Sequence, residues 1–329
     1  QRQMCIRDSC NANWDGTEIN MYGAGSNCRN TAELQSLLVH EWGHGYDYND
    51  GGGGDKPSEA YADIVGILAA RDSCVMRGVY NDGTTCEGWG NPCLTCTGFR
   101  DFDWTARAWN TPSTPTNWAQ VVCPPDDSVY SGPCRRQTHC ESHISSEAIY
   151  DLATRDLPAS VMDQASAWQL VVRLWYETRP GSGGNAYSCL LPLSNSCDAN
   201  SWYQKMRVAD DDDGDLSNGT PHAAELYAAF ARHNIACGLP EAPENQSTSS
   251  CTPLAQPALT VTDTPAGTEL SWTAVDGAAA GGHARRRNED LRHGTCRHAM
   301  PFRLEEVEDG VDRARHGEHV DFSQRVLAS

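Results

Sequence analysis

Fifteen cysteines in 329 residues limit the structures that this chain can adopt more than any other feature of its sequence. They are spread through stretches rich in glycine and proline, and so many thiols are unusual in a reducing cytosol unless they hold metal. We therefore expect disulfide bonds and a secreted, extracellular protein. Cys93-x-x-Cys96 has the form of half a zinc ribbon or of a redox pair, but the chain has no second Cys-x-x-Cys, so structural disulfides are favoured.

The acidic composition excludes one large class of function. Asp and Glu number 44 against 25 Lys and Arg, so the formal net charge is −19, and a nucleic acid would be repelled rather than neutralised. The longest apolar run, Ile64 to Ala70, has seven residues, whereas a membrane-spanning helix needs about 18 or more. We expect no nucleic-acid partner and no membrane span.

The two ends of the chain differ in character from its middle. Residues 1–9 match nothing that follows them, and we interpret them as an artefact of cloning or assembly. Residues 239–256 have the composition of a linker, and 257–277 alternate apolar and polar residues around a turn, which predicts the start of a fibronectin-III-like or immunoglobulin-like β-sandwich. Residues 278–329 are rich in Arg and His and lack Trp and Tyr, a pattern that fits either a frame-shifted sequence or a solvated tail.

Between these ends the pattern is mainly helical. Asn30 and Glu33 have the spacing of a capping box, and apolar residues recur after them with a helical period as far as Trp42. Pro57 is expected to open a second helix. The remaining expectations are an extended segment at 10–23 with a turn at Asp15-Gly16, loops joined by disulfides at 73–140, and helices at 142–156, at 161–178 and from Thr220 to about Ile235.

The first predicted helix carries the motif His40-Glu41-Trp42-Gly43-His44. Residues four apart share one face of a helix, so both imidazoles can reach one Zn²⁺. Glu41 is then placed to take a proton from a water at the metal, as a general base. A motif this short also arises by chance, and the predicted helix around it is what gives it weight.

The second predicted helix offers further acidic groups. A catalytic zinc site needs a third protein ligand and one open position. Glu59 and Asp63 are four residues apart and face the same way. Glu59 can complete the ligand set, and Asp63 can accept the free N–H of His40 and thereby fix the orientation of that ring. The alternative is that the pair forms a solvated acidic face.

These segments resemble the gluzincin metallopeptidases of the thermolysin-like and fungalysin-like branches, in which H-E-x-x-H is followed by E-x-x-x-D on the next helix. Residues 11–16 (NANWDG) are similar to the family's substrate-binding edge strand. The resemblance implies that Asn11 and Ala12 bind the substrate backbone, whereas an ordinary hairpin is the alternative. It spans 10–238 and implies an α+β, zincin-like catalytic domain with a mostly helical C-terminal lobe, truncated at its N-terminal β side.

The family also uses a histidine to stabilise the negative charge that develops on the reacting carbonyl oxygen. Residues 141–147 (ESHISSE) resemble that segment, so the resemblance implies this catalytic role for His143. His139 is the other candidate for this catalytic role. The remaining alternative is that His143 has no catalytic role. A tyrosine that assists this step in the family has no clear counterpart in the chain.

A run of acidic residues begins at Asp210. Asp211, Asp213 and Asp215 offer oxygen ligands that suit Ca²⁺. The run does not have the spacing of an EF-hand, because Ala209 occupies the first position of that frame. A calcium site and a solvated acidic loop are equally compatible with the pattern.

Together these patterns predict a secreted zinc-dependent endopeptidase that hydrolyses protein or peptide substrates, with one catalytic Zn²⁺ and with Ca²⁺ as a second candidate ion. Because the β-rich half of the cleft is missing, we expect this stretch to be a fragment of the enzyme, and it could be inactive by itself. The rival hypothesis is a non-catalytic extracellular binding or adhesion protein with a vestigial zincin fold. A zinc hydrolase with non-peptide substrates would have the same ligands.

Overall fold

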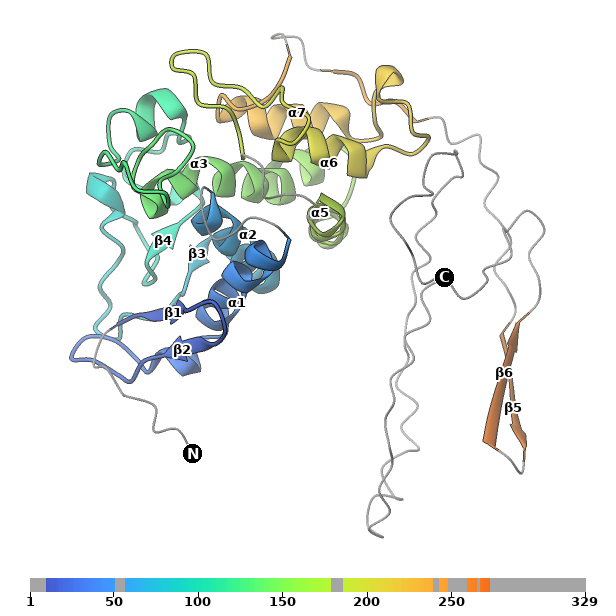
Figure 1. The fold of residues 1–329 in the computed structure, drawn as a ribbon, viewed down its shortest axis with the longest axis horizontal. Coiled ribbons are helices and arrows are strands. Elements are labelled where there is room, and N and C mark those ends of the chain that lie inside the picture. The colour runs from blue at the N-terminus through green and yellow to red at the C-terminus, as the bar shows by residue number, and fades with distance from the viewer. Residues whose placement is uncertain are drawn as a thin grey trace. The chain divides into compact units, whose positions relative to one another are not determined.

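The structure of the chain is a computed structural model (Figure 1). It describes residues 10–50, 57–178, 186–238 and 243–247 in full, and only the backbone of 259–264 and 267–272. The chain divides into two units, with the boundary between Ser247 and Thr248, inside the segment whose composition predicts a linker. Residues 1–9 and 278–329, which the sequence sets apart, lie outside the described residues.

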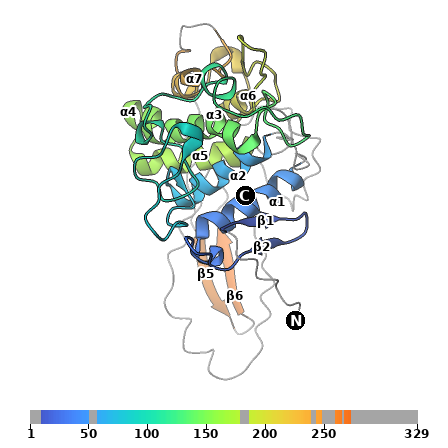
Figure 2. The same ribbon diagram turned by 90° about the vertical axis from the view of Figure 1, so that its left-hand side faces the viewer.

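The first unit is a succession of layers that begins with a β-hairpin. Strands β1 (Ala12–Trp14) and β2 (Ile19–Met21) pair antiparallel, with Trp14 opposite Ile19. The turn follows the prediction, because Gly16 has a φ of +101° and the Asp15 carboxylate accepts the backbone N–H of Thr17 at 3.0 Å. Figures 1 and 2 show the layers in the order β2, β1, then helices α1 (Gln35–Asn49), α2 (Ser58–Ala70), α3 (Thr138–Asp151) and α7 (Ala223–Arg232).

The start of α1 differs from the prediction. The Asn30 side chain does cap a helical turn, but it accepts the N–H of Ala32 within a separate 3-10 helix, η1 (Thr31–Glu33). Leu34 then has extended backbone angles, and α1 begins at Gln35 without a side-chain cap. The capping-box spacing therefore marks the short turn in front of the helix. The extended backbone of Leu34 separates that turn from α1, which begins its own series of hydrogen bonds.

Helices α1 and α2 approach each other closely at a glycine. A Cβ built on Gly43 would lie 2.8 Å from the Cα of Ala62, so only glycine fits at this point of the H-E-x-x-H helix. Tyr61, next to Ala62 on α2, is buried against aromatic residues: the ring centroids of Tyr61 and Trp175 are 5.2 Å apart, and those of Trp175 and Trp202 are 5.0 Å apart. This packing fixes α2, and with it Glu59, relative to α1.

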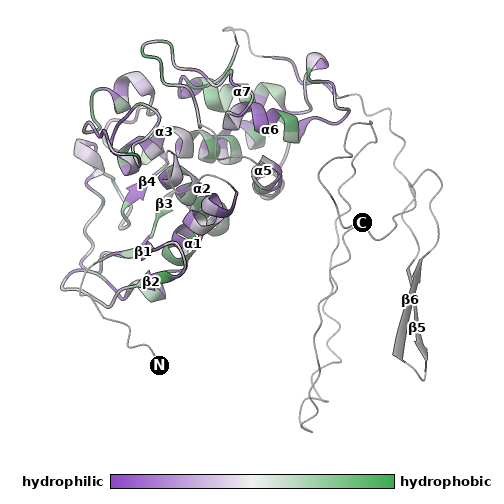
Figure 3. Cartoon of the chain, in the orientation of Figure 1, coloured by the Kyte–Doolittle hydropathy of each residue, from purple (hydrophilic) through white to green (hydrophobic). Residues whose placement is uncertain are grey.

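The other elements of the first unit are short or peripheral. The predicted helix at 142–156 begins earlier, at Thr138, and continues beyond α3 as a π-helical turn, η5 (Leu152–Asp156). Hydrophilic and hydrophobic residues are interspersed along the helices (Figure 3). The remaining elements are β3 (Cys74–Val75), β4 (Arg100–Asp101), η2 (Gly88–Gly90), η3 (Trp104–Ala106), η4 (Pro115–Ala119), α4 (Leu157–Ser160), α5 (Gln164–Thr178), α6 (Trp202–Asp210) and η6 (Leu216–Asn218).

Six disulfides link described residues of the first unit, as the cysteine content predicts. Cys93 and Cys96 each pair with another residue and not with one another, so the Cys-x-x-Cys spacing is neither a redox pair nor half of a zinc ribbon. The pairs are Cys10–Cys28, Cys74–Cys96, Cys86–Cys93, Cys123–Cys140, Cys134–Cys189 and Cys197–Cys237.

The second unit contributes a single hairpin to the described residues. Strands β5 (Leu259–Thr264) and β6 (Gly267–Trp272) pair antiparallel, with Leu259 opposite Trp272. These are the two strands that the alternating pattern predicts, while the rest of the expected β-sandwich lies outside the described residues. The described chain is thus a mixture of helices and small antiparallel sheets, and it contains no helix with both the length and the apolar character to cross a membrane.

Candidate metal centre

Two histidines of α1 form one side of the candidate site. His40 and His44 lie one turn apart, and their ring centroids are 4.9 Å from each other. His40 is buried, and the side chain of His44 is 15% exposed. The helical spacing of the motif therefore brings both rings to the same face, the one that meets α2.

Glu59, in the first turn of α2, faces this pair. Its Oε2 lies 3.5 Å from His40 Nε2, and its Oε1 lies 3.5 Å from His44 Nε2. One ligand atom from each of the three residues lies within 4.8 Å of the other two. The structure thus brings together the three groups that the sequence predicts as metal ligands.

The donor set fits a small divalent cation. Ligands that bind tetrahedrally at about 2.0–2.1 Å are separated from one another by about 3.3 Å, which is close to both His–Glu distances. Glu59 Oε2 is buried and has no hydrogen-bond partner among the described residues. Such an orphaned oxygen is costly unless a cation or another donor satisfies it, and two imidazoles with one carboxylate are a ligand set that zinc commonly takes.

Each histidine is oriented through its other ring nitrogen. His40 Nδ1 lies 3.1 Å from Asp63 Oδ1, and His44 Nδ1 lies 2.9 Å from Ser58 Oγ. Both Nε2 atoms therefore remain directed at Glu59. The Asp63 contact involves the predicted pair of residues, at ion-pair distance but without the geometry of a hydrogen bond, whereas Ser58 carries no sequence signal that distinguishes it from an ordinary helix-start serine.

The electrostatics of the two rings differ. Burial lowers the pKa of His40, but Asp63 and Glu59 outweigh burial and raise it to about 10. For His44, burial dominates and lowers the pKa to about 4. Burial also opposes ionisation of Glu59, yet His139 and His40 keep the pKa of its carboxyl well below the usual range. A cation that binds here displaces a proton from His40 and finds His44 and Glu59 already in their ligand forms.

A buried arginine that sequence reasoning missed completes the surroundings of the site. Arg100, on β4, is 5% exposed, and its Nη2 lies 2.6 Å from Asp63 Oδ1 and 3.7 Å from Glu59 Oε2. This positive charge offsets the two buried carboxylates. It comes from the cysteine-rich segment, far from the motif, where no spacing rule points to it.

Glu41 lies beside the candidate ligands and is held by the hairpin. The N–H of Trp14, on β1, donates to Glu41 Oε2 at 2.9 Å. Glu41 is 5% exposed, and burial raises the pKa of its carboxyl. A carboxylate with a raised pKa, fixed next to a metal site, has the properties of a general base.

The predicted substrate-binding residues lie on the same hairpin. Ala12 is the first residue of β1 and is buried, and Asn11 just before it is exposed. Among the described residues β1 pairs with no strand other than β2. The hydrogen bond from Trp14 places β1 next to Glu41.

The structure places the two candidate histidines of α3 differently from the prediction. His139, in the first turn, has its Nε2 3.1 Å from Glu59 Oε1, and its side chain is 42% exposed. His143, one turn further along, is fully buried, and its Nδ1 lies 3.1 Å from Arg107 Nη1 and 3.2 Å from Glu147 Oε1. The position next to the ligand cluster therefore belongs to His139, and His143 belongs to a buried network behind it.

The acidic run near Asp210 is partly engaged in its own turns. Asp211 Oδ2 accepts the N–H of Gly214, and Asp215 caps η6 through the N–H of Ser217. The carboxylates that lie close together are those of Asp211, Asp212 and Asp213, so Asp215 is not one of them. Exposed acidic groups often gather without an ion, and the predicted calcium site stays a hypothesis.

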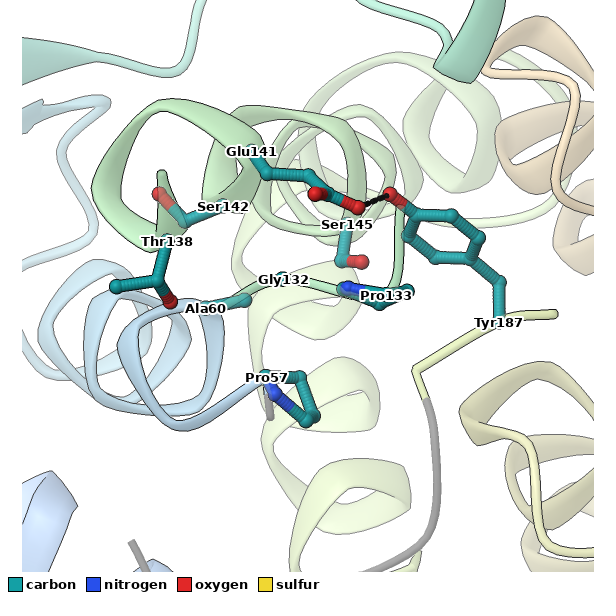
Figure 4. A pocket seen from close by; sticks show the side chains of 9 residues that line it. All are labelled: Pro57, Ala60, Gly132, Pro133, Thr138, Glu141, Ser142, Ser145 and Tyr187. Carbon is teal, nitrogen blue, oxygen red and sulfur yellow. Dashed lines mark hydrogen bonds between the residues drawn. The ribbon is translucent and has the colours of Figure 1, made fainter. Parts of the chain in front are cut away.

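A small cavity lies beside α3, separate from the candidate ligands (Figure 4). It has room for about 10 Å³, and its lining includes Glu141 and Tyr187, which are joined by a hydrogen bond of 2.6 Å. Such a space holds no more than about one water. Burial raises the pKa of Glu141 to about 7, although Tyr187 and two backbone N–H groups oppose the change.

Fold and site together define a mixed helical and β chain that carries a candidate divalent-metal centre at the junction of α1, α2 and α3. A scan against protein-family models matches no family, and a search of curated proteins finds no relative. Function is therefore inferred from the chemistry of the described residues.

Proposed function

We propose that the protein is a secreted zinc-dependent endopeptidase of the gluzincin type, with His40, His44 and Glu59 as metal ligands. The observation that carries this proposal is the convergence of these three side chains with Glu41 at the edge of the same cluster. Six disulfides in the described residues support an oxidising compartment outside the cell.

A zinc ion held by these ligands supplies a nucleophilic water at neutral pH. The Trp14 bond uses Glu41 Oε2, so Glu41 Oε1 would be the oxygen that accepts a proton from the attacking water. The same carboxyl then passes the proton to the leaving amine. Burial keeps the proton on Glu41 between the two transfers, because it favours the neutral carboxylic acid.

The donor for the developing oxyanion is His139 in this proposal, in place of the predicted His143. Its Nε2 faces the cluster at 3.1 Å from Glu59, and its partial exposure leaves room for a substrate next to it. His143 has no such access because its ring is fully buried. Removal of a preorganised donor of this kind from an acyl-transfer site lowers kcat by about 10²–10³-fold.

The test combines metal analysis with casein cleavage. The chain, expressed with any sequence that precedes it in its reading frame, is assayed as purified, after chelation and after zinc is restored. We expect one zinc per chain, cleavage that disappears on chelation, and recovery with zinc. One bound zinc without cleavage in any state would contradict the peptidase and favour the non-catalytic binding protein.

A further inference from the structure

Gln137 occupies the turn that leads into α3, two residues before His139. Its side-chain Oε1 accepts the backbone N–H of Cys140 at 2.8 Å, so Gln137 is the N-cap of the helix. Its Nε2 lies 2.7 Å from His139 Nδ1. One amide group therefore holds both the helix start and the ring of the proposed oxyanion donor.

The orientation of this amide follows from its partners. A backbone N–H can only donate, so the atom that faces Cys140 must be the carbonyl oxygen of Gln137. The amide nitrogen, which can only donate, then faces His139 Nδ1. Nδ1 accepts that hydrogen bond and so carries no proton, which leaves the proton of the neutral ring on Nε2.

We propose that Gln137 is a positioning residue that holds His139 as the Nε2–H tautomer, with that N–H directed into the ligand cluster. The inference rests on the proposed function, since only an acyl-transfer site needs a donor there. A ring with its proton on Nδ1 would present a lone pair to the oxyanion and would repel it. The amide thus selects the one neutral form of His139 that can stabilise negative charge.

Gln137 and Glu59 contact opposite nitrogens of this ring. In the described part of the chain, the polar contacts of the His139 ring are those with Gln137 and Glu59. The turn itself is rigid, because Glu141 accepts the N–H groups of Cys134 at 2.6 Å and Arg136 at 3.2 Å. The cap residue is therefore held in place independently of the histidine that it orients.

The first experiment measures the tautomer and needs no peptidase activity. The full chain, with ¹⁵N-labelled histidine and metal removed, is examined by long-range ¹⁵N–¹H correlation NMR at about pH 8, above the usual histidine pKa. The His139 signals are assigned by their loss in His139→Gln. We expect a protonated Nε2 and a bare Nδ1 in the wild type and in Glu59→Leu, where the carboxylate that also favours a proton on Nε2 is gone, and a mixture of tautomers when Gln137→Leu is added to Glu59→Leu. A proton on Nδ1 in the wild type, or the same tautomer in Glu59→Leu with and without Gln137→Leu, overturns the proposal.

The second experiment separates positioning from stability by kinetics. Gln137→Ser keeps an N-cap oxygen for Cys140 but has no amide for His139, and Ser201→Ala removes the N-cap of α6 as a matched control. We expect kcat of Gln137→Ser to fall about 10- to 100-fold with KM little changed, and kcat of Ser201→Ala to stay at the wild-type value. Wild-type kcat in Gln137→Ser overturns the proposal. If the wild type cleaves nothing, the proposed function fails, and the NMR result alone decides the tautomer.

Discussion

His40 Nδ1 lies 3.1 Å from Asp63 Oδ1, and the opposite nitrogen of the same ring faces Glu59. One histidine thus joins two carboxylates of α2 that are a single helical turn apart. The arrangement explains why Asp63 is fully buried although it carries a charge. Its negative charge is shared between His40 and Arg100.

Replacement of Asp63 should weaken metal binding without removing a ligand. In Asp63→Asn the partner of His40 Nδ1 loses its charge, so the ring is a poorer and less well oriented ligand. We expect zinc affinity to fall about 10- to 100-fold, measured by competition with a chromophoric chelator. Asp72→Asn, which changes a partly exposed aspartate paired with Arg77, is the control. Equal affinity in Asp63→Asn and wild type would show that this contact does not orient the ligand.

Replacement of Glu41 should separate binding from catalysis. Glu41→Gln keeps the size of the side chain but cannot accept a proton from water. We expect peptide hydrolysis to fall by about 10²–10⁴-fold while one zinc per chain is retained, measured by metal analysis and casein cleavage on the same sample. Glu33→Gln changes an exposed glutamate and should leave both quantities unchanged. Wild-type hydrolysis in Glu41→Gln would refute its role as the base.

Removal of Arg100 should destabilise the metal-free chain. Arg100→Met removes one of the two cations beside the buried carboxylates of Asp63 and Glu59 and leaves only His40, and breaking a buried pair in this way costs about 3–5 kcal/mol. Urea unfolding of the metal-free protein measures the loss, and added zinc should restore part of it. Arg77→Met removes an exposed pair and should cost about 0–1 kcal/mol. A similar small cost in Arg100→Met would mean that the pair is not buried in solution.

Stability should fall in mild acid because of His143. Burial lowers the pKa of His143 to about 4 in the folded chain, whereas an unfolded histidine titrates near about 6.5. The unfolded chain therefore binds the proton first, so this contribution to stability is complete above about pH 6.5 and is lost as the pH falls to about 4, by roughly 3 kcal/mol. His143→Gln, whose Oε1 can still accept from Arg107, should show a shallower loss over that range in urea unfolding. Parallel curves for the two proteins would contradict the assignment.

The convergence of the candidate ligands and the helices that carry them could be predicted because they depend on local spacing. Residues four apart share one face of a helix. This places His40 and His44 on one face of α1, and Glu59 and Asp63 on one face of α2. Local spacing does not predict the close approach of the two helices at Gly43, because that contact depends on their packing, although the glycine itself is part of the motif.

The parts that could not be predicted depend on where distant segments meet. His139 and His143 lie on one face of α3, so spacing alone cannot choose between them; the helix starts at Thr138, which puts His139 at the accessible end and His143 in the core. Arg100 reaches the site through a two-residue strand that has no pattern of its own. The prediction that Asn30 caps the long helix was wrong because a 3-10 turn and an α-helix share the same capping signal.

The central claim is that zinc binds to two imidazoles and one carboxylate, and X-ray absorption at the zinc edge tests it most directly. For the zinc-loaded chain we predict nitrogen and oxygen scatterers at about 2.0–2.2 Å, with two imidazole rings, and the loss of one ring in His44→Ala. A shell of sulfur at about 2.3 Å would place the metal on cysteine thiolates, which the disulfide-bonded Cys86, Cys93 and Cys96 do not offer, and would contradict the account.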